Sequence, residues 1–384
     1  MTKNLIFSYF ICVYNTIFIN LFKDWWNLIQ AEWRESNGQP YLYVKADTHY
    51  ELGVATGKGL VKQIATSRMI NQYFPKLLRI SYEEFVSTAR EYLPYIPENY
   101  QDEIRGMSIG ASEASGQTFS FNDILVQALA LEVLYGRYNF DPGDIDLNTH
   151  QACTCLGAVN KDGSVVMGQN YDAAGQSIAT MAWVLHKVGD GPYIFSARLG
   201  GVPAMPIGKN EHGVAMVVNV INSTVTAPVM KPRFVRVREA FETCKTAQEA
   251  YKIMFENDEF PFSLNMLISD PEKIIGVQIM PQEIRPNDVK DIQVQANTYD
   301  YVDWQKYLRD PDYSLERHQR ASHLLHKSYT ESEKITNEMI RDILRDSPII
   351  CRDVEGDKAQ TVVFMTRETF GLGNARGKVG KIPI

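Results

Sequence analysis

The feature that most constrains the fold is a segment that begins at a cysteine and ends at a carboxylate. Residues 151–155 read QACTC and residues 168–172 read GQNYD, with an apolar-rich run between them. The centre of this run holds Asp162-Gly163, which between two apolar stretches is typical of a β-hairpin turn. Because the outer ends of a hairpin meet, we expect Cys153 and Asp172 to be neighbours. A thiol placed beside a carboxylate indicates a catalytic centre.

The length and charge of the chain narrow the classes of protein to which it can belong. Its 384 residues are enough for a large core and one or two domains. The formal net charge is −7, and the sequence contains no long block of lysine and arginine. Binding to phosphate backbones requires a concentrated positive face, so we expect no nucleic-acid partner.

The cysteines argue against a disulfide framework and against a metal site. Their number is odd and their spacing wide. Zinc sites usually place two residues between paired cysteines and add a second pair, which is missing here, and the seven histidines show no ligand spacing. We therefore expect no metal or cofactor, and interpret Cys155 as a buried neighbour of Cys153 on one strand. The five cysteines are Cys12, Cys153, Cys155, Cys244 and Cys351.

Residues 1–40 form a separate hydrophobic N-terminal segment. Residues 5–22 are strongly apolar and have Lys3 before them and Lys23 after them, as in a signal peptide or signal anchor. Four polar residues interrupt the run, so an amphipathic helix that continues to Trp33 is the alternative. The first interpretation predicts a secretory, lysosomal-type or membrane-anchored protein, and the second predicts a cytoplasmic one.

The pattern from residue 41 to about residue 140 is mostly helical. A weakly alternating strand at 41–44 comes first, and Thr48 with Glu51 three residues later has the spacing of a capping box. Helices are predicted at about 50–74, 81–93, 98–114 and 120–134. A polar loop at 138–149 then leads to Cys153.

Short strands and helices alternate after Cys153, which indicates a layered α+β sandwich with helices covering packed sheets. The predicted helices are 235–244, 247–256, 314–328 and 331–345. The predicted strands are 155–159, 165–169, 181–186, 193–197, 215–220, 264–269, 274–280, 293–296, 361–366 and 369–372.

Several separate segments together resemble one enzyme family. They are Cys153-Thr154, Asp162-Gly163, residues 168–172 (GQNYD), 103–107 (EIRGM), 121–125 (FNDIL), 210–215 (NEHGVA), 296–298 (ANT), 317–320 (RHQR) and 350–352 (ICR). In this order they resemble N-terminal-nucleophile (Ntn) hydrolases of the acyl-CoA:6-aminopenicillanate acyltransferase-like group (peptidase C45-like). That group neighbours the choloylglycine hydrolases and the acid-ceramidase-like amidases. Gln169 stands where those two relatives carry arginine, which favours the acyltransferase-like branch.

The resemblance implies a four-layer αββα sandwich and an inactive precursor that cuts its own chain. The cut would fall between Ala152 and Cys153 through an N→S acyl shift, with Ala152 replacing the glycine common in the acyltransferase. Residues 41–152 would become a mainly α small subunit and residues 153–384 the catalytic large subunit, and the two would stay associated. The new α-amine of Cys153 would act as the base for its own thiol.

The resemblance also assigns roles to individual residues. Cys153 would be the nucleophile and Asp172 would hold its α-amine. Asn219 and Asn297 would donate to the oxyanion. Arg317, with Arg320 as the alternative, would lower the pKa of the thiol.

Three functions remain open from the sequence. The first is hydrolysis of a small-molecule linear amide through a thioester on Cys153. The second is transfer of an acyl group from acyl-CoA to an amine. The third is a catalytically degenerate relative that acts as a binding protein.

Overall fold

The computed structural model describes residues 30–141, 152–173, 178–309, 312–351, 360–365, 369–373 and 377–384. The apolar run at residues 5–22 lies outside them, so its role in targeting stays a prediction. Within the described ranges, no helix combines the length and the apolar character needed to cross a bilayer.

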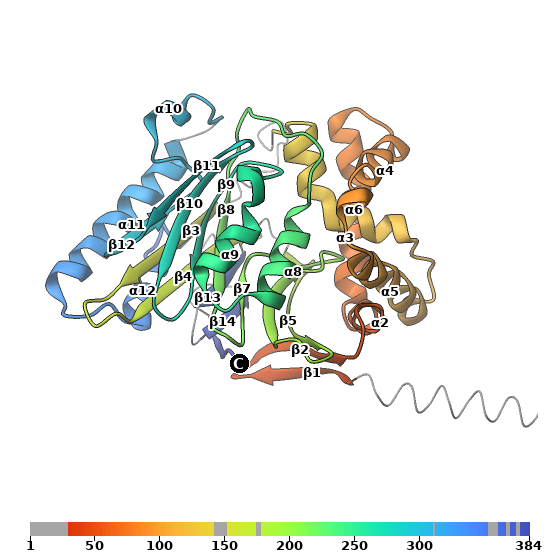
Figure 1. Cartoon of the computed structure of the whole chain (residues 1–384), viewed down its shortest axis with the longest axis horizontal. Helices are drawn as coiled ribbons and strands as arrows, with labels where there is room; N and C mark the ends of the chain where they lie inside the picture. The colour runs from red at the N-terminus through yellow and green to blue at the C-terminus, as the bar shows by residue number, and fades with distance from the viewer. Residues whose placement is uncertain are drawn as a thin grey trace, which may run out of the picture.

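Two large β-sheets form the centre of the molecule (Figure 1). The nine-stranded sheet has the order β1-β2-β5-β6-β7-β8-β9-β10-β11, and the six-stranded sheet has the order β12-β3-β4-β13-β14-β15. The strands of the first are β1 (Gln30–Ser36), β2 (Gln39–Ala46), β5 (Met181–Val188), β6 (Ile194–Leu199), β7 (Gly208–Asn210), β8 (Ala215–Val220), β9 (Leu264–Ser269), β10 (Ile274–Met280) and β11 (Glu283–Asp288). Those of the second are β3 (Ala152–Val159), β4 (Val165–Ala173), β12 (Ile292–Gln295), β13 (Gln360–Met365), β14 (Thr369–Gly373) and β15 (Gly380–Lys381).

The two sheets pack face to face, and helices cover their outer faces. Strands β3 and β4 contact β8 across the interface, and Trp183 of β5 stacks against Phe364 of β13 at a centroid distance of 5.7 Å. Helices α8 (Arg233–Thr243) and α9 (Ala247–Met254) contact the nine-stranded sheet. Helices α11 (Asp312–Glu331) and α12 (Asn337–Leu344) contact the six-stranded sheet. The predicted α+β fold with an αββα order of layers is confirmed.

Further helices lie beside this sandwich, on the right in Figure 1. The predicted capping box is present at the first of them, where Thr48 and Glu51 exchange side-chain and backbone hydrogen bonds. The helices of this group are α2 (His49–Gly59), α3 (Val61–Leu78), α4 (Tyr82–Arg90), α5 (Glu98–Ser115) and α6 (Phe121–Leu131), with a 3₁₀ turn η1 (Leu93–Tyr95) and a π-helical turn η2 (Glu132–Arg137). The short elements η4 (Glu256–Asp258) and α10 (Val302–Gln305) occur later in the chain.

Helices α2 and α5 touch through glycines. A Cβ added to Gly53 would lie 2.1 Å from the carbonyl oxygen of Glu103, and one added to Gly106 would lie 2.2 Å from that of Tyr50. No larger residue fits at either position without moving the backbone. The close approach also fixes α5 against α2, and with it the Glu103 side chain, whose carboxylate pairs with Arg198 of β6.

The structure corrects three sequence predictions. Residues 30–36 form β1, so the alternative of a helix reaching Trp33 is wrong for that part. The helix predicted at 50–74 is two helices that break at Leu60. Strand β11 was missed because it is a largely exposed edge strand containing Pro286, and it therefore shows no alternating apolar pattern.

The two parts predicted on either side of Cys153 share one sheet. Strand β2 pairs in parallel with β5, with Leu42 opposite Val184, and β1, which lies within residues 1–40, pairs with β2, so the chain before Cys153 contributes two strands to the nine-stranded sheet. The part before Cys153 is therefore built into the sandwich. Its removal would expose the edge of β5.

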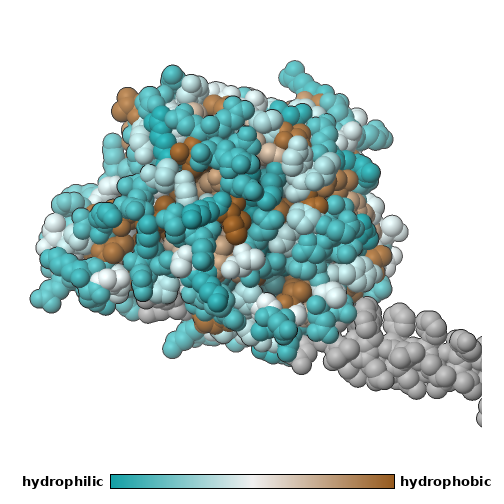
Figure 2. All heavy atoms as spheres, viewed as in Figure 1, coloured by the Kyte–Doolittle hydropathy of each residue, from teal (hydrophilic) through white to brown (hydrophobic). Residues whose placement is uncertain are grey.

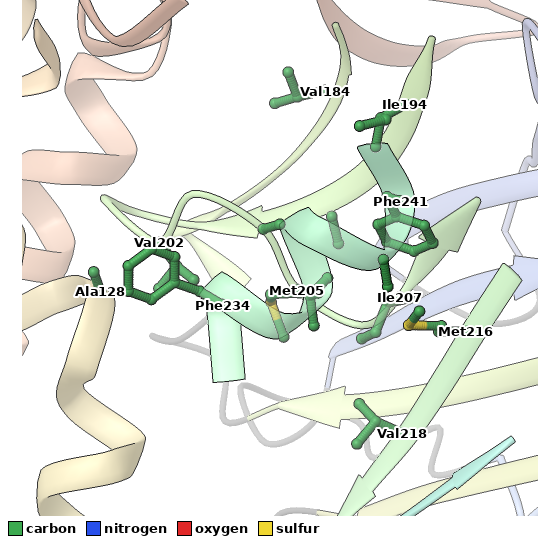
Figure 3. Close-up of a cluster of buried hydrophobic side chains, with 14 of the residues drawn as sticks. Ala128, Val184, Ile194, Val202, Met205, Ile207, Met216, Val218, Phe234 and Phe241 are labelled. Atoms are coloured by element: carbon green, nitrogen blue, oxygen red, sulfur yellow. The ribbon is translucent and has the colours of Figure 1, made fainter. Parts of the chain in front are cut away.

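A continuous apolar core fills the space between the nine-stranded sheet and α8 (Figure 3). Phe234 and Phe241 of α8 belong to this core together with sheet residues such as Val184 and Ile194, and all four are fully or almost fully buried. On the face shown in Figure 2, hydrophilic side chains predominate and hydrophobic ones are scattered. The apolar faces of the elements are therefore mostly turned inward.

Candidate active site

The predicted hairpin is formed by β3 and β4. Ala152 lies opposite Asp172 and Cys153 opposite Tyr171, and the turn contains Gly163 at φ 78°. The two outer ends therefore meet as expected, and they bring a thiol and a carboxylate to one end of the six-stranded sheet. Both side chains are buried, with 1% exposure each.

Alternation along β3 points the Cys153 side chain toward the opposite sheet. The next residue on the same face, Cys155, donates from its thiol to Asn219 Oδ1 of β8 at 3.3 Å. Thr154 points the other way and meets Arg317 of α11. Since successive side chains of a strand lie on opposite faces, the Cys153 thiol lies between the two sheets.

Asn297 binds the backbone nitrogen of Cys153. It follows the end of β12, and its Oδ1 accepts from the Cys153 N–H at 2.8 Å. Its Nδ2 donates to the carbonyl oxygen of Val220 at 2.6 Å. This side chain therefore links the thiol-bearing residue to the end of β8. It is the Oδ1 of Asn297, assigned from the sequence to an oxyanion role, that contacts the atom expected to become the α-amine.

Arg317 holds the backbone around Cys153 from the outer side of the sheet. Its Nη1 donates to the Cys153 carbonyl at 2.5 Å and to Thr154 Oγ1 at 3.2 Å. Its Nη2 donates to Asn297 Oδ1 at 2.8 Å and to Ser314 Oγ at 3.1 Å. The guanidinium is fully buried. A charged side chain so placed fixes the orientation of both Cys153 and Asn297.

The alternative arginine lies elsewhere. Arg320 forms a bidentate pair with Asp346, at 2.8 Å and 2.7 Å, and its side chain is 39% exposed. Of the two candidates, Arg317 is therefore the one that contacts Cys153.

The environment raises the pKa of the Cys153 thiol to about 12. Burial is the largest cause, and the negative charge of Asp172 acts in the same direction. Arg317 and the hydrogen bonds from Asn297 and Val220 oppose them without reversing the shift. In this uncut chain the thiol is therefore protonated at neutral pH, and a base must take its proton before it can attack.

Asn219 is buried between the sheets and contacts Cys155. Its Nδ2 has no hydrogen-bond partner among the residues that the structure describes. A buried amide donor without a partner is costly, roughly 1–3 kcal/mol, unless a bound group uses it. The group is thus available to a substrate oxygen.

Two aromatic rings complete the surroundings of the thiol. Tyr171 of β4 and Tyr135 of η2 are buried, and the pKa of each phenol is raised chiefly by burial, with the Cys153 thiol a further cause. Tyr135 lies 6.1 Å from Phe140 and 6.4 Å from Phe262, between ring centroids. The wall beside the thiol is therefore aromatic.

The sequence did not indicate the role of Ser314, nor the structural role of Gln169, which had served only to favour one branch of the family. Ser314 supports Arg317 from one helical turn earlier, and its spacing of three residues was the available signal. Gln169 bridges the two sheets, since its amide donates to the Val218 carbonyl and accepts from the Val218 N–H at 3.2 Å. In the described parts of the chain no group of three or more potential ligands could hold a metal ion.

Comparison with known proteins places the chain in a family. The family model described as acyl-coenzyme A:6-aminopenicillanic acid acyl-transferase matches residues 159–366, more than half of the chain. The chain belongs to this family. The matched range begins six residues after Cys153. It includes Asp172, Asn219, Asn297 and Arg317 of this chain. The resemblance to the acyl-CoA:6-aminopenicillanate acyltransferase-like group that the sequence indicated is confirmed.

Solved structures of two kinds are similar to this family member. A conjugated bile acid hydrolase from Clostridium perfringens shares 13% identity over 60% of this chain and 92% of its own, with a TM-score of 0.45. An N-acylethanolamine-hydrolyzing acid amidase ortholog from Caenorhabditis elegans shares 15% identity over 60% of this chain and 100% of its own, with a TM-score of 0.43. No curated protein matches the chain.

Proposed function

We propose that this protein cuts itself between Ala152 and Cys153 and then hydrolyses a linear amide of a small molecule through a thioester on Cys153. The observation that carries the proposal is the 2.8 Å hydrogen bond from the Cys153 backbone nitrogen to Asn297 Oδ1. Cleavage would turn this nitrogen into an α-amine that is already held by a buried acceptor beside its own thiol. Residues 41–152 would form the small subunit and residues 153–384 the large one, with the two remaining associated.

Self-cleavage would use the Cys153 thiol and the carbonyl of the preceding residue, Ala152. The Cys153 thiol gives up its proton and the sulfur attacks that carbonyl carbon. The carbon–nitrogen bond then breaks, and the nitrogen gains a proton as it becomes the α-amine. Water then hydrolyses the thioester and leaves Ala152 with a free carboxylate. Asp172 lies opposite Ala152 in the hairpin and its charge acts on the Cys153 thiol, so it would also stabilise the new ammonium.

Turnover uses the same groups. The thiol passes its proton to the α-amine and attacks the substrate carbonyl, and Asn219 Nδ2 donates to the developing oxyanion. The ammonium returns the proton to the departing amine, which leaves a thioester on Cys153. Water, deprotonated by the α-amine, hydrolyses the thioester and releases the acid. The aromatic wall formed by Tyr135 and Tyr171 favours substrates with an apolar acyl group.

Acyl transfer is the second candidate, and the description of the family model favours it. The same thioester forms from an acyl-CoA, and an amine replaces water in the second step. Parallel assays of amide hydrolysis and of CoA release from acyl-CoA, with a set of apolar acyl groups, separate the two. Release of amine without dependence on CoA supports hydrolysis, whereas product formation that requires acyl-CoA and an amine contradicts it.

The two asparagines give the first prediction. Asn219→Ala and Asn297→Ala should each lower kcat by ~10²–10³, because the first removes the proposed donor to the oxyanion and the second removes the acceptor that holds the nitrogen of Cys153. Rates of amide hydrolysis by purified variants, measured with matched amounts of cleaved enzyme, test this. The exposed Asn287 on β11 provides the control, and Asn287→Ala should leave kcat unchanged. Equal rates for Asn219→Ala and wild type would remove that residue from the mechanism.

The raised pKa of the thiol gives the second prediction. Because that pKa is about 12, the thiolate fraction of the uncut chain grows as pH rises through the whole range from 6 to 9. Self-cleavage of freshly refolded chain should therefore accelerate steadily over this range, without a plateau. The fraction of cut chain on gels, followed over time at each pH, measures it. A rate that is constant above pH 6 would show that thiol ionisation does not limit cleavage.

A further inference from the structure

Asn265 lies behind the candidate active site. It is on β9, directly opposite Asn219 of β8 in the sheet register, and it is 1% exposed. Its Nδ2 donates to the carbonyl oxygens of Ala296 at 3.0 Å and Thr298 at 2.6 Å. One side-chain amide thus binds the backbone immediately before and immediately after Asn297.

These two hydrogen bonds fall where the six-stranded sheet no longer holds the chain. Strand β12 ends at Gln295, which is its last residue paired with β3. The next three residues have left the ladder, so the direction in which Asn297 projects depends on other contacts. Asn265 supplies them from the facing sheet.

We propose that Asn265 is a positioning residue that fixes Asn297 against the backbone nitrogen of Cys153, an inference that rests on the proposed function. With the carbonyls of Ala296 and Thr298 tied to one amide, the Cβ of Asn297 points toward Cys153 and its Oδ1 meets the nitrogen at 2.8 Å. Loss of the tie would let the loop shift, and displacements of about 1 Å at a reacting group can lower rates ~10²-fold.

The need to bind two buried carbonyl oxygens does not by itself explain why position 265 is an asparagine. Asn210 makes the same kind of contact at a distant place, with its Nδ2 on the carbonyls of Phe241 and Cys244 at 3.0 and 2.8 Å. The Oδ1 of Asn210 also accepts two backbone N–H groups, from His212 and Val214. The Oδ1 of Asn265 has no hydrogen-bond partner within the described ranges. Asn265 therefore carries a desolvation cost that the structural asparagine avoids.

Asn210 makes a matched control for the experiment. Asn265→Ala and Asn210→Ala each remove a buried amide bound to two carbonyls, so both should lower the melting temperature. Only Asn265→Ala should lower kcat for amide hydrolysis, by about 10- to 100-fold with KM changed little, and it should slow self-cleavage by a similar factor. Equal losses of kcat in the two variants would overturn the proposal.

A double-mutant cycle separates positioning from an independent role. If Asn265 acts through Asn297, adding Asn265→Ala to Asn297→Ala should lower kcat less than twofold further. Two losses that multiply would overturn the proposal. If Asn265→Ala fails to fold, Asn265→Ser replaces it. A serine hydroxyl reaches at most one of the two carbonyls, so we expect a loss of kcat smaller than that expected for Asn265→Ala.

A wrong role for Asn265 can be distinguished from a wrong proposed function. If wild-type protein is cut at Cys153 and active while Asn265→Ala retains full kcat, only the role of Asn265 is wrong. If the wild-type chain is never cut and Cys153→Ala leaves the activity intact, the proposed function itself is wrong.

Discussion

A Cys153→Ala variant is expected to remain a single uncut chain and to lose all amide hydrolysis and acyl transfer. The substitution removes the sulfur that attacks Ala152 and, later, the substrate, and no other group in the proposed mechanism can form the thioester. The buried methyl group left at position 153 fits the space of the thiol, and the contacts of the backbone nitrogen and carbonyl with Asn297 and Arg317 do not need the sulfur. The variant should therefore fold.

Gel electrophoresis, far-ultraviolet circular dichroism and an activity assay measure the three parts of this prediction. Cys155→Ala serves as the matched control, because it removes the neighbouring buried thiol on the same face of β3. It should still be cut. Processing that persists in Cys153→Ala and stops in Cys155→Ala would move the nucleophile to Cys155.

The second large effect, a loss of folding stability, is expected when Glu103 is replaced, although this residue lies outside the active site. Its carboxylate is fully buried between two buried arginines, with Arg198 Nη1 at 2.9 Å and Arg238 Nη1 at 2.9 Å from its oxygens. Although burial alone would raise it, these cations hold the pKa of Glu103 well below its usual range. Glu103→Ala leaves both guanidiniums without this partner and should lower the free energy of unfolding by about 3–5 kcal/mol.

Urea unfolding in the Cys153→Ala background measures this on one uncut chain. The control is Asp102→Ala, one residue earlier on α5, where an exposed carboxylate pairs with Arg105. Exposed pairs contribute little, so that variant should lose less than about 1 kcal/mol. Similar losses of unfolding free energy in Glu103→Ala and Asp102→Ala would show that the buried Glu103 pairs contribute no more to stability than an exposed ion pair.

The position of Glu103 also bears on the association of the proposed subunits. Glu103 belongs to residues 41–152, whereas Arg198 and Arg238 belong to residues 153–384. Tyr100 adds a hydrogen bond of 2.7 Å to Glu242 across the same boundary. In the cut wild-type background, Glu103→Ala should therefore release the small chain during gel filtration. Because the depressed pKa keeps Glu103 ionised, the stability that it provides is present above about pH 4.5 and is lost only as the pH falls toward the folded-state pKa.

Local patterns in the sequence were sufficient to predict the parts of the fold that depend on neighbours along the chain. The β3–β4 hairpin followed from two apolar runs around Asp162-Gly163, and the start of α2 followed from Thr48 and Glu51. Strand β1 and the pairing of β2 with β5 were not predictable, because they depend on contacts between distant segments. Residue patterns specify strands far better than they specify which strands pair.

In the candidate site, too, some residues could be predicted from the sequence and others depend on contacts between distant segments. The resemblance assigned Arg317, with Arg320 as the near alternative. Only the structure separates the residue bound to Cys153 from the one bound to Asp346. Asn265 acts across sheets, so nothing in its own segment marks it as important. Glu103 begins the segment 103–107 that carries part of the resemblance, but its pairing with Arg198 depends on a contact between a helix and a distant strand.

The most direct test of the account is the intact mass of the purified wild-type protein, combined with sequencing of the N-terminus of its larger chain. We expect two associated chains, the larger of which begins at Cys153. A single uncut chain at neutral and acidic pH, with Cys153 unreactive toward iodoacetamide, would contradict it.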